Sequence, residues 1–460
     1  MKRHLLPILS ALLMLVSAGC PKPEEEGPVG PPPGTTLRVL VVDDELLAQS
    51  IGYLRSEWEA QSGVKLKITD LPANDYDPAK TPEADVVIVP SWMLGPANAE
   101  GWLVPLPERV VQDDESDWSD VFPQIRGKEV ARSGEPVAVP FGSPVPMLYY
   151  RVDLLEKAGT EVPTNWTEYT KAVKALGDSP AAEPLAEGWA GLTLLARSAS
   201  YVSHPDNLST LFRISTMEPL IAGEPFVRGL TELVETADEA SLEMGPAAAR
   251  AAFWQGKAGM AITWPTAADE KAAEVEAEFP VGVAELPGSP NVYDLGETSW
   301  EKRDKDSDGR VPLLAASGRV GIVTTNSQWP DASLELLLWL TNKKWSSQVC
   351  SQSMNTAPFR ESHVAIAAGW VEAPMTEDTA QQYGEAVATA LEREQSLLAL
   401  PIPGRPEYLA ALDEAVREAV RKEKSPQEAL DGVAVRWQEI TEKLGVDKQK
   451  AAYRASLGLK

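Results

Sequence analysis

Residues 137–150, VAVPFGSPVPMLYY, decide how the chain is divided into domains. The apolar runs Val137–Val139 and Met147–Tyr150 are typical of short buried strands. Residues 140–144 between them, Pro-Phe-Gly-Ser-Pro, interrupt regular structure. Two strands separated in this way indicate a chain that crosses from one domain to another. The length of 460 residues agrees, because it exceeds what one hydrophobic core usually fills and favours two or three domains.

Strands and helices alternate on the N-terminal side of this crossing. An apolar run at 37–42 predicts a buried strand, and Asp43 or Asp44 can cap the helix after it. The apolar stripe of that helix comprises Leu47, Ile51, Leu54 and Trp58, and the helix is predicted to stop at Gly63. Further strands are predicted at 64–68 and 84–89. The order strand, helix, strand is typical of an open α/β sheet, whose ligands bind beyond the carboxyl ends of the strands.

The C-terminal side of the crossing contains strands and then mostly helices. Strands are predicted at 256–262 and 279–286. A helix begins near Asn165, with Glu168 as its capping partner, and another opens at Pro330. Residues 425–428, Ser-Pro-Gln-Glu, form a capping box with Pro at the first helical position. The last quarter of the chain is therefore predicted to be helical.

The charge and composition exclude several classes of function. The chain has 42 Lys and Arg against 68 Asp and Glu, a formal net charge of -26, so its surface repels nucleic acid. Three His leave little material for zinc sites or His-based catalysis, and we expect neither a cofactor nor a metal. Gly-x-Ser-x-Gly, His-Glu-x-x-His and Walker motifs are absent from the sequence. The absence of these motifs argues against an enzyme.

The first twenty residues predict export and a lipid anchor. A basic start and the apolar run 5–16 match an export signal, and the run is too short for a bilayer core of about 30 Å. Ser17-Ala18-Gly19 before Cys20 resembles a bacterial lipoprotein cleavage box. We predict a signal peptide at 1–19 and lipidation of Cys20, with ordinary secretion as the alternative. The Pro-, Gly- and Glu-rich segment 20–36 predicts an extended linker that holds a periplasmic or cell-surface body near the membrane.

Five segments of the chain, in order, resemble a known family. They are 84–106, from Ala84-Asp85-Val86-Val87 to Val104-Pro105-Leu106; 140–159, from Pro140-Phe141-Gly142-Ser143 to Lys157-Ala158-Gly159; 163–168, Pro-Thr-Asn-Trp-Thr-Glu; 256–265, from Gly256-Lys257-Ala258-Gly259 to Trp264-Pro265; and 326–360, ending in Ala357-Pro358-Phe359-Arg360. Together they resemble the carbohydrate-type extracellular solute-binding proteins of ABC importers (family 1, maltose-binding-protein-like).

The resemblance implies a fold and a function. The expected fold is α/β, with two lobes around a hinged cleft (the type II periplasmic-binding-protein fold) and a helical C-terminal region. We expect lobe I to comprise 37–141 and 286–350, and lobe II to comprise 145–285 and 351–460. A monomer of this kind would capture a sugar or oligosaccharide in the cleft and deliver it to the transmembrane subunits of an ABC permease.

A sugar site needs aromatic rings for the C–H faces and polar groups for the hydroxyls. Trp92 and Trp264 each follow a predicted strand, and the resemblance places both in the cleft. Core packing is the alternative for each ring. Trp189 and Trp300 are further aromatic candidates. The candidate hydroxyl partners are Asp43, Asp44, Ser143 and Arg360.

Three other functions stay open at this point. A secreted glycoside-active enzyme would need two carboxylates about 5–10 Å apart, which sequence cannot identify among so many acids. Ferric-ion binding could use Tyr149 and Tyr150, although neighbours on a strand point to opposite faces, so we expect one of them in the core. A tethered sensor without a permease is the third. The segment 304–309, Asp-Lys-Asp-Ser-Asp-Gly, begins like a calcium loop but has Ala315 in place of the twelfth-position Glu, which favours a solvated turn.

Overall fold

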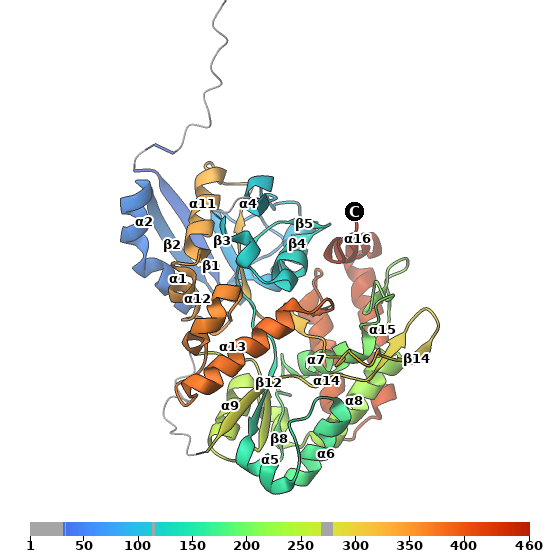
Figure 1. The fold of residues 1–460 in the computed structure, drawn as a ribbon. Helices are drawn as coiled ribbons and strands as arrows, with labels where there is room; N and C mark the ends of the chain where they lie inside the picture. Colours follow the sequence, from blue (N-terminus) through green and yellow to red (C-terminus); the bar gives the residue numbers. More distant parts are fainter. Residues whose placement is uncertain (1–30, 33, 113–115, 268–278) are drawn as a thin grey trace, which may run out of the picture.

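The computed structural model describes residues 31–32, 34–112, 116–267 and 279–460 (Figure 1). The predicted signal peptide, Cys20 and most of the linker lie outside the described residues. Within the described part, no helix is long and apolar enough to cross a membrane.

Lobe I is built on a five-stranded sheet in the order β2-β1-β3-β16-β6. The strands are β1 (Thr36–Val42), β2 (Lys65–Leu71), β3 (Val86–Pro90), β6 (Val139–Gly142) and β16 (Arg319–Val323). β1 is parallel to both β2 and β3, whereas β16 runs antiparallel to β3 and β6. The carboxyl ends of β1 and β3 therefore lie at one edge of the sheet. The helices of this lobe are α1 (Glu45–Tyr53), α2 (Arg55–Ser62), α3 (Leu94–Ala99), α4 (Glu108–Gln112), α11 (Pro330–Thr341) and α12 (Ser346–Cys350).

The predicted helix after β1 is in fact two helices. Asp44 caps α1 as predicted, because its Oδ1 accepts a hydrogen bond from the Leu47 N–H at 3.1 Å. The helix breaks at Leu54, whose φ of -88° and ψ of 0° leave the helical range, and α2 follows at once. It ends at Gly63 as predicted, with φ +71°, a left-handed conformation that favours glycine.

Lobe II contains a smaller sheet and most of the helices. Its sheet has the order β12-β7-β11-β8, formed by β7 (Met147–Arg151), β8 (Ala181–Ala182), β11 (Met260–Thr263) and β12 (Val281–Glu285). Its helices are α5 (Val152–Ala158), α6 (Trp166–Leu176), α7 (Ala190–Val202), α8 (Glu224–Thr236), α9 (Pro246–Trp254), α14 (Arg405–Val420), α15 (Pro426–Leu444) and α16 (Val446–Ser456). The predicted caps are present: the Glu168 N–H donates to Asn165 Oδ1 at 3.0 Å, and Ser425 with Glu428 forms a capping box.

The chain crosses between the lobes where the sequence predicts it. β6 belongs to the sheet of lobe I and β7 to the sheet of lobe II, so residues 143–146 are a crossing. A second crossing leads from β12 to β16. α13 (Glu377–Glu392) packs against β12 and against the short helix Glu361–Trp370. The segment β15 (Leu313–Leu314) lies in this second crossing and pairs with β17 (Leu397–Leu398), which follows α13.

The hairpin after β12 lies with lobe II. β13 (Asn291–Asp294) pairs with β14 (Ser299–Lys302), and the hairpin packs on α7, where the Trp300 ring is 5.8 Å from the Tyr201 ring. The expected lobe I segment from 286 onwards thus begins with elements that contact lobe II, and β16 is its strand in the sheet of lobe I. The short segments β4 (Ala131–Arg132) and β5 (Glu135–Pro136) form one further pair, and β9 (Phe212–Arg213) and β10 (Glu218–Pro219) form another.

Candidate ligand-binding site

The carboxyl end of β1 carries a buried ionic cluster. Asp44 is 7% exposed and accepts hydrogen bonds from Asn355 at 3.2 Å and from Ser353, besides capping α1. Arg319 Nε lies 3.2 Å from the Oδ2 atom that Ser353 and Asn355 also contact, so both carboxylate oxygens of Asp44 are used by the fold. Asp43 differs: its carboxylate is more than half exposed, and Arg319 donates to its backbone carbonyl. The Asp43 carboxylate lies 3.7 Å from the Arg319 guanidinium, and its exposure makes it the member of the predicted pair that can meet a ligand.

A buried carboxylate, Glu129, lies at the neighbouring strand ends. Ser91 follows β3 and Ser143 follows β6, and both hydroxyls donate to the Ser317 carbonyl, at 3.4 and 2.8 Å. Burial raises the pKa of Glu129 to about 7, although the hydroxyls of Ser91 and Ser143 and the charge of Arg132 favour its ionised form. Ser143 is 1% exposed, so the structure places it inside this buried polar group and not on an open surface.

Trp92 lies at the seam between the lobes. It belongs to the single turn Ser91–Met93 after β3 and is half-buried. The Arg405 guanidinium, from the start of α14, stands 5.3 Å from its ring centroid. Arg405 is itself buried and donates to three backbone carbonyls, those of Ala399, Ala315 and Ala316, at 2.8–3.1 Å. One face of Trp92 is thus covered by a cation on a fixed support, and desolvation lowers the pKa of Arg405 to about 9.

The aromatic group of lobe II has two layers. Trp264 follows β11 as predicted but is only 4% exposed, within the core of α7 and α14. The Trp189 ring packs over it at 5.0 Å between centroids and is partly exposed. The backbone on both sides of Trp189 is fixed by Asp413, whose carboxylate accepts hydrogen bonds from the Gly188 and Gly191 N–H groups at 2.7 and 2.6 Å. Trp189 is therefore the ring of this pair that can meet solvent, with the exposed carboxylate of Glu187 beside it in the chain.

Two predicted site residues are held by partners of their own. The Trp300 indole N–H donates to Glu224 at 3.0 Å, and the Arg228 guanidinium covers its ring at 4.8 Å. Arg360 is 2% exposed and donates to the carbonyls of Thr341 and Asp117 at 2.8 and 2.7 Å. In the described part of the chain, neither residue bonds to or stacks on Trp92, Trp189 or Trp264. Both support the fold locally.

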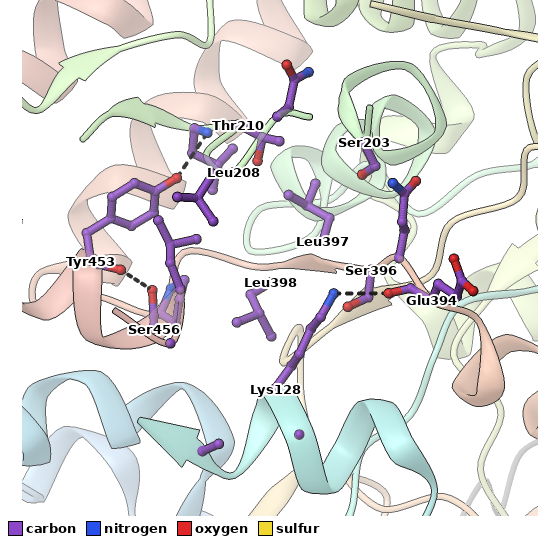
Figure 2. Close-up of a pocket in the computed structure, with 18 of the residues that line it drawn as sticks. Lys128, Ser203, Leu208, Thr210, Glu394, Ser396, Leu397, Leu398, Tyr453 and Ser456 are labelled. Carbon is purple, nitrogen blue, oxygen red and sulfur yellow. Dashed lines mark hydrogen bonds between the residues drawn. The ribbon is translucent and has the colours of Figure 1, made fainter. Parts of the chain in front are cut away.

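A cavity of about 520 Å³ opens between the lobes (Figure 2). Lys128 reaches it from lobe I, Ser203 and Leu208 from lobe II, and Tyr453 and Ser456 from α16. The Lys128 ammonium donates to the Glu394 carbonyl at 3.4 Å, and burial lowers its pKa. None of the predicted site residues lines this cavity, so it is distinct from the edge that carries Trp92 and Asp43.

The arrangement also bears on ion binding. Tyr149 is buried, with its hydroxyl 3.4 Å from Glu372, whereas Tyr150 lies against Gly282, so one of the two tyrosines is in the core as predicted. Ligand atoms of His204, Asp294 and Glu301 lie within 4.8 Å of one another.

The tautomer of His204 disfavours a metal among these three residues. Its Nδ1 accepts the Asp206 N–H at 3.1 Å, which leaves the proton on Nε2, 3.3 Å from Glu301. A protonated nitrogen cannot ligate a metal. In the loop that resembles a calcium site, the Asp308 carboxylate pairs with Arg393 at 2.8 Å.

The sequence did not identify Glu129, Arg405 or Asp413. Arg405 opens a helix in the run 401–406, Pro-Ile-Pro-Gly-Arg-Pro, where the prolines mark a helix start. That signal gives the start of the helix but not the three carbonyls that the side chain reaches. No motif in the sequence marks Glu129 or Asp413, and with 68 acidic residues in the chain nothing distinguishes them before folding.

Solved structures share this fold. A solute-binding protein of an ABC transporter from Agrobacterium radiobacter K84, in complex with ribitol, has a TM-score of 0.65 and 20% identity, covering 88% of this chain and 99% of its own. The sugar-binding protein MalE from Xanthomonas citri has a TM-score of 0.65 and 17% identity, covering 89% and 98%. Maltose-bound MalE3 from T. maritima has a TM-score of 0.61 and 18% identity, covering 88% and 100%. These likenesses show the two-lobed α/β fold that the sequence predicts.

A family model assigns the chain by sequence. The model of the bacterial extracellular solute-binding proteins matches residues 40–346, more than half of the chain. The match extends over both sheets and both crossings described above. Members of this family are binding proteins, so the expectation of a non-enzyme is confirmed and the glycoside-active alternative is excluded. The chain therefore belongs to the bacterial extracellular solute-binding protein family.

Proposed function

We propose that this protein captures a neutral sugar or polyol between its lobes and delivers it to an ABC permease. The observation that carries the ligand class is the pair of partly exposed rings at the lobe edges, Trp92 in lobe I and Trp189 in lobe II. Flat rings suit the apolar faces of a sugar ring, and the acidic protein disfavours anionic ligands. The three related structures named above are described with ribitol, as sugar-binding, or with maltose, which supports the same class.

The polar groups that contact the ligand follow from which carboxylates stay exposed in the fold. Asp43 and Glu187 have exposed carboxylates, one on each lobe. Carboxylates accept hydrogen bonds from sugar hydroxyls, and a buried polar group left without its partner lowers the affinity for analogues that lack the hydroxyl. Asp44, Ser143 and Arg360 are already satisfied by the protein, so we assign them to structure and not to ligand contact. Trp264 acts beneath Trp189 as its support.

Closure of the lobes is the proposed mechanism. A ligand that contacts Trp92 on one lobe and Trp189 on the other gains its full contacts only when both lobes meet it, so it shifts the population towards the closed arrangement. A permease that recognises this arrangement would then receive the ligand. A sensor that binds the ligand without a permease would use the same closure, and transport assays separate the two.

Ligand class is tested by calorimetry. Purified protein is titrated with a panel of monosaccharides, oligosaccharides and polyols, and we expect saturable binding to at least one. Trp189→Ala and Trp92→Ala should each lower that affinity by about 5-fold or more, since a stacked aromatic contact contributes roughly 1 kcal/mol or more. Trp345→Ala is the matched control. Trp345 is also a half-buried ring, but it directly precedes α12 and packs on Trp339, away from the proposed site. Equal affinities in all four proteins would refute the site.

Anchoring and transport are tested in cells. If Cys20 is lipidated, wild-type protein incorporates labelled fatty acid and sediments with membranes, whereas Cys20→Ser does neither. Cys350→Ser is the control, because Cys350 is fully buried. Uptake of the labelled ligand should fall in a strain that lacks the protein. Uptake that is unchanged, with binding intact, would favour the sensor.

A further inference from the structure

The last helix of the chain, α16, contacts both lobes. It follows α15 directly through Gly445 and packs against α15, and it also packs against α3 and β4 of lobe I. In Figure 1 it lies beside β4 and β5, above the helices of lobe II. A hinge movement of the two lobes must therefore either carry α16 away from one of them or be opposed by it.

The attachment of α16 to lobe II is buried. The Tyr453 hydroxyl lies 2.9 Å from Ser209 Oγ and accepts the Leu211 N–H at 3.2 Å. Its ring packs edge-on against Phe212 at 5.4 Å between centroids, and the residue is 3% exposed. Gln449 adds a hydrogen bond to the Pro403 carbonyl at 3.1 Å. Such buried contacts are costly to break, so α16 moves with lobe II.

The attachment to lobe I combines packing on α3, whose residues 94–97 are buried, with polar contacts nearer the surface. The Ser133 N–H donates to the Ala455 carbonyl at 2.8 Å. The Lys448 ammonium pairs with Glu100, directly after α3, and Lys460 lies 3.5 Å from Glu135. Exposed ion pairs contribute little each and are screened by salt. The ion pairs on this side of α16 are therefore easier to break than the buried contacts of Tyr453.

A cavity beneath α16 separates the two lobes, so the contacts of α16 with both lobes connect them at this place. It has a volume of about 520 Å³ and separates Lys128 of lobe I from Ser203 and Leu208 of lobe II, with Tyr453 and Ser456 along its side (Figure 2). Where this space lies, the two lobes do not pack on each other directly. α16 spans the gap and connects them.

We propose that α16 is an interlobe strap: it is fixed to lobe II, is held to lobe I by the Lys448–Glu100 and Lys460–Glu135 ion pairs, and sets the angle between the lobes at rest. Loss of one exposed pair should lower the equilibrium constant that favours the resting arrangement by about 2- to 5-fold. High salt should have the same effect, because it screens both pairs.

The test measures the interlobe distance without any ligand, so its failure is independent of the proposed function. Spin labels are placed at Lys67→Cys on lobe I and Lys171→Cys on lobe II, both exposed positions. K448E should shift and broaden the distance distribution, and the charge swap K448E/E100K should restore it. K443E is the control, since Lys443 forms an exposed pair with Glu407 inside lobe II at 2.9 Å.

Salt gives a second measurement on the same labelled proteins. Raising the NaCl concentration to about 1 M should move the wild-type distribution towards that of K448E, while K448E itself changes less. Three results would overturn the strap: a K448E distribution equal to the wild type, a K443E distribution equal to that of K448E, or a charge swap that fails to restore the wild-type distance.

Discussion

The two lobes place the same sequence feature in opposite surroundings. In lobe I, Trp92 follows β3 and is half-buried at a polar edge, beside Ser91 and under the Arg405 guanidinium. In lobe II, Trp264 follows β11 and is 4% exposed in an apolar core, with Trp189 above it. A tryptophan directly after a strand therefore marks the edge of a sheet but does not say whether the ring faces solvent. What covers each ring comes from elements that are distant in the chain: Trp189 for Trp264, and Arg405 for Trp92.

The largest expected difference between the two edges is in packing. Trp264→Ala should lower the free energy of unfolding by about 3–5 kcal/mol, because it leaves a large cavity in the lobe II core. Trp264→Phe should lose less, because it keeps most of the ring volume, and the Trp264 indole N–H has no hydrogen-bond partner within the described residues. Urea denaturation measures both. A Trp264→Ala variant as stable as Trp264→Phe would contradict the burial of this ring.

The polar edge of lobe I should respond to pH instead. Burial raises the pKa of Glu129 from an ordinary 4.5 to about 7, so the folded state prefers the protonated form. The contribution of Glu129 to stability is therefore complete below about pH 4.5 and is lost as the pH rises towards 7. The total loss is about 3 kcal/mol for a shift of this size.

Glu129→Gln tests this pH dependence, because the amide is neutral throughout. Its free energy of unfolding should gain on the wild type by up to about 3 kcal/mol between pH 5 and pH 8, measured by urea denaturation at each pH. Glu135→Gln, an exposed acid on the neighbouring β5, is the control and should follow the wild type. A constant difference between wild type and Glu129→Gln across this range would refute the assignment.

Loss of the Arg405 side chain, which packs on Trp92, should lower the free energy of unfolding less than the changes at Trp264 and Glu129. Arg405→Gln leaves buried carbonyls of Ala315, Ala316 and Ala399 without their donor and should cost about 2 kcal/mol of unfolding free energy. Arg436→Gln, on the exposed face of α15, should stay within about 0.5 kcal/mol of the wild type. Equal losses in the two variants, measured by thermal or urea unfolding, would show that Arg405 does not hold this edge.

The smallest expected effect on stability is that of Trp92 itself. Trp92→Ala removes a half-buried ring and one cation–π contact, so we expect a loss of about 1 kcal/mol by urea denaturation. Its effect on ligand affinity should be the larger one. If Trp92→Ala destabilises the protein as much as Trp264→Ala, the two rings do not differ in their contribution to core packing.

Local features of the fold could be predicted from local sequence. The strand at 37–42, the crossing at 143–146 and the helix caps at Asn165 and Ser425 each depend on a few neighbouring residues, and the structure contains all of them. The break at Leu54 was not predicted, because the apolar stripe continues across it and its backbone angles depend on packing.

Contacts over long sequence distances could not be predicted in this way. The apolar pattern of the last helices shows that one face is buried, but not that α16 packs against lobe I as well as lobe II. Trp264 packs against Trp189, and Arg405 donates to the carbonyls of Ala315 and Ala316, which lie 90 and 89 positions away in the chain. The sequence shows these residue types but not which residues become their neighbours. The family resemblance supplied the two-lobed arrangement, while the exposure of each tryptophan required the structure.

The point where the chain enters the fold affects how the protein can sit at a membrane. The Lys65 N–H donates to the Thr35 carbonyl at 2.8 Å, so the entering segment is fixed at the amino-terminal edge of the lobe I sheet. β1 then runs for seven residues, about 23 Å, to the edge that carries Asp43. A tether at Cys20 would therefore pull on the side of lobe I remote from the ligand edge. Lobe I would be the stationary half, the ligand edge would face away from the anchor, and lobe II would be the half that swings.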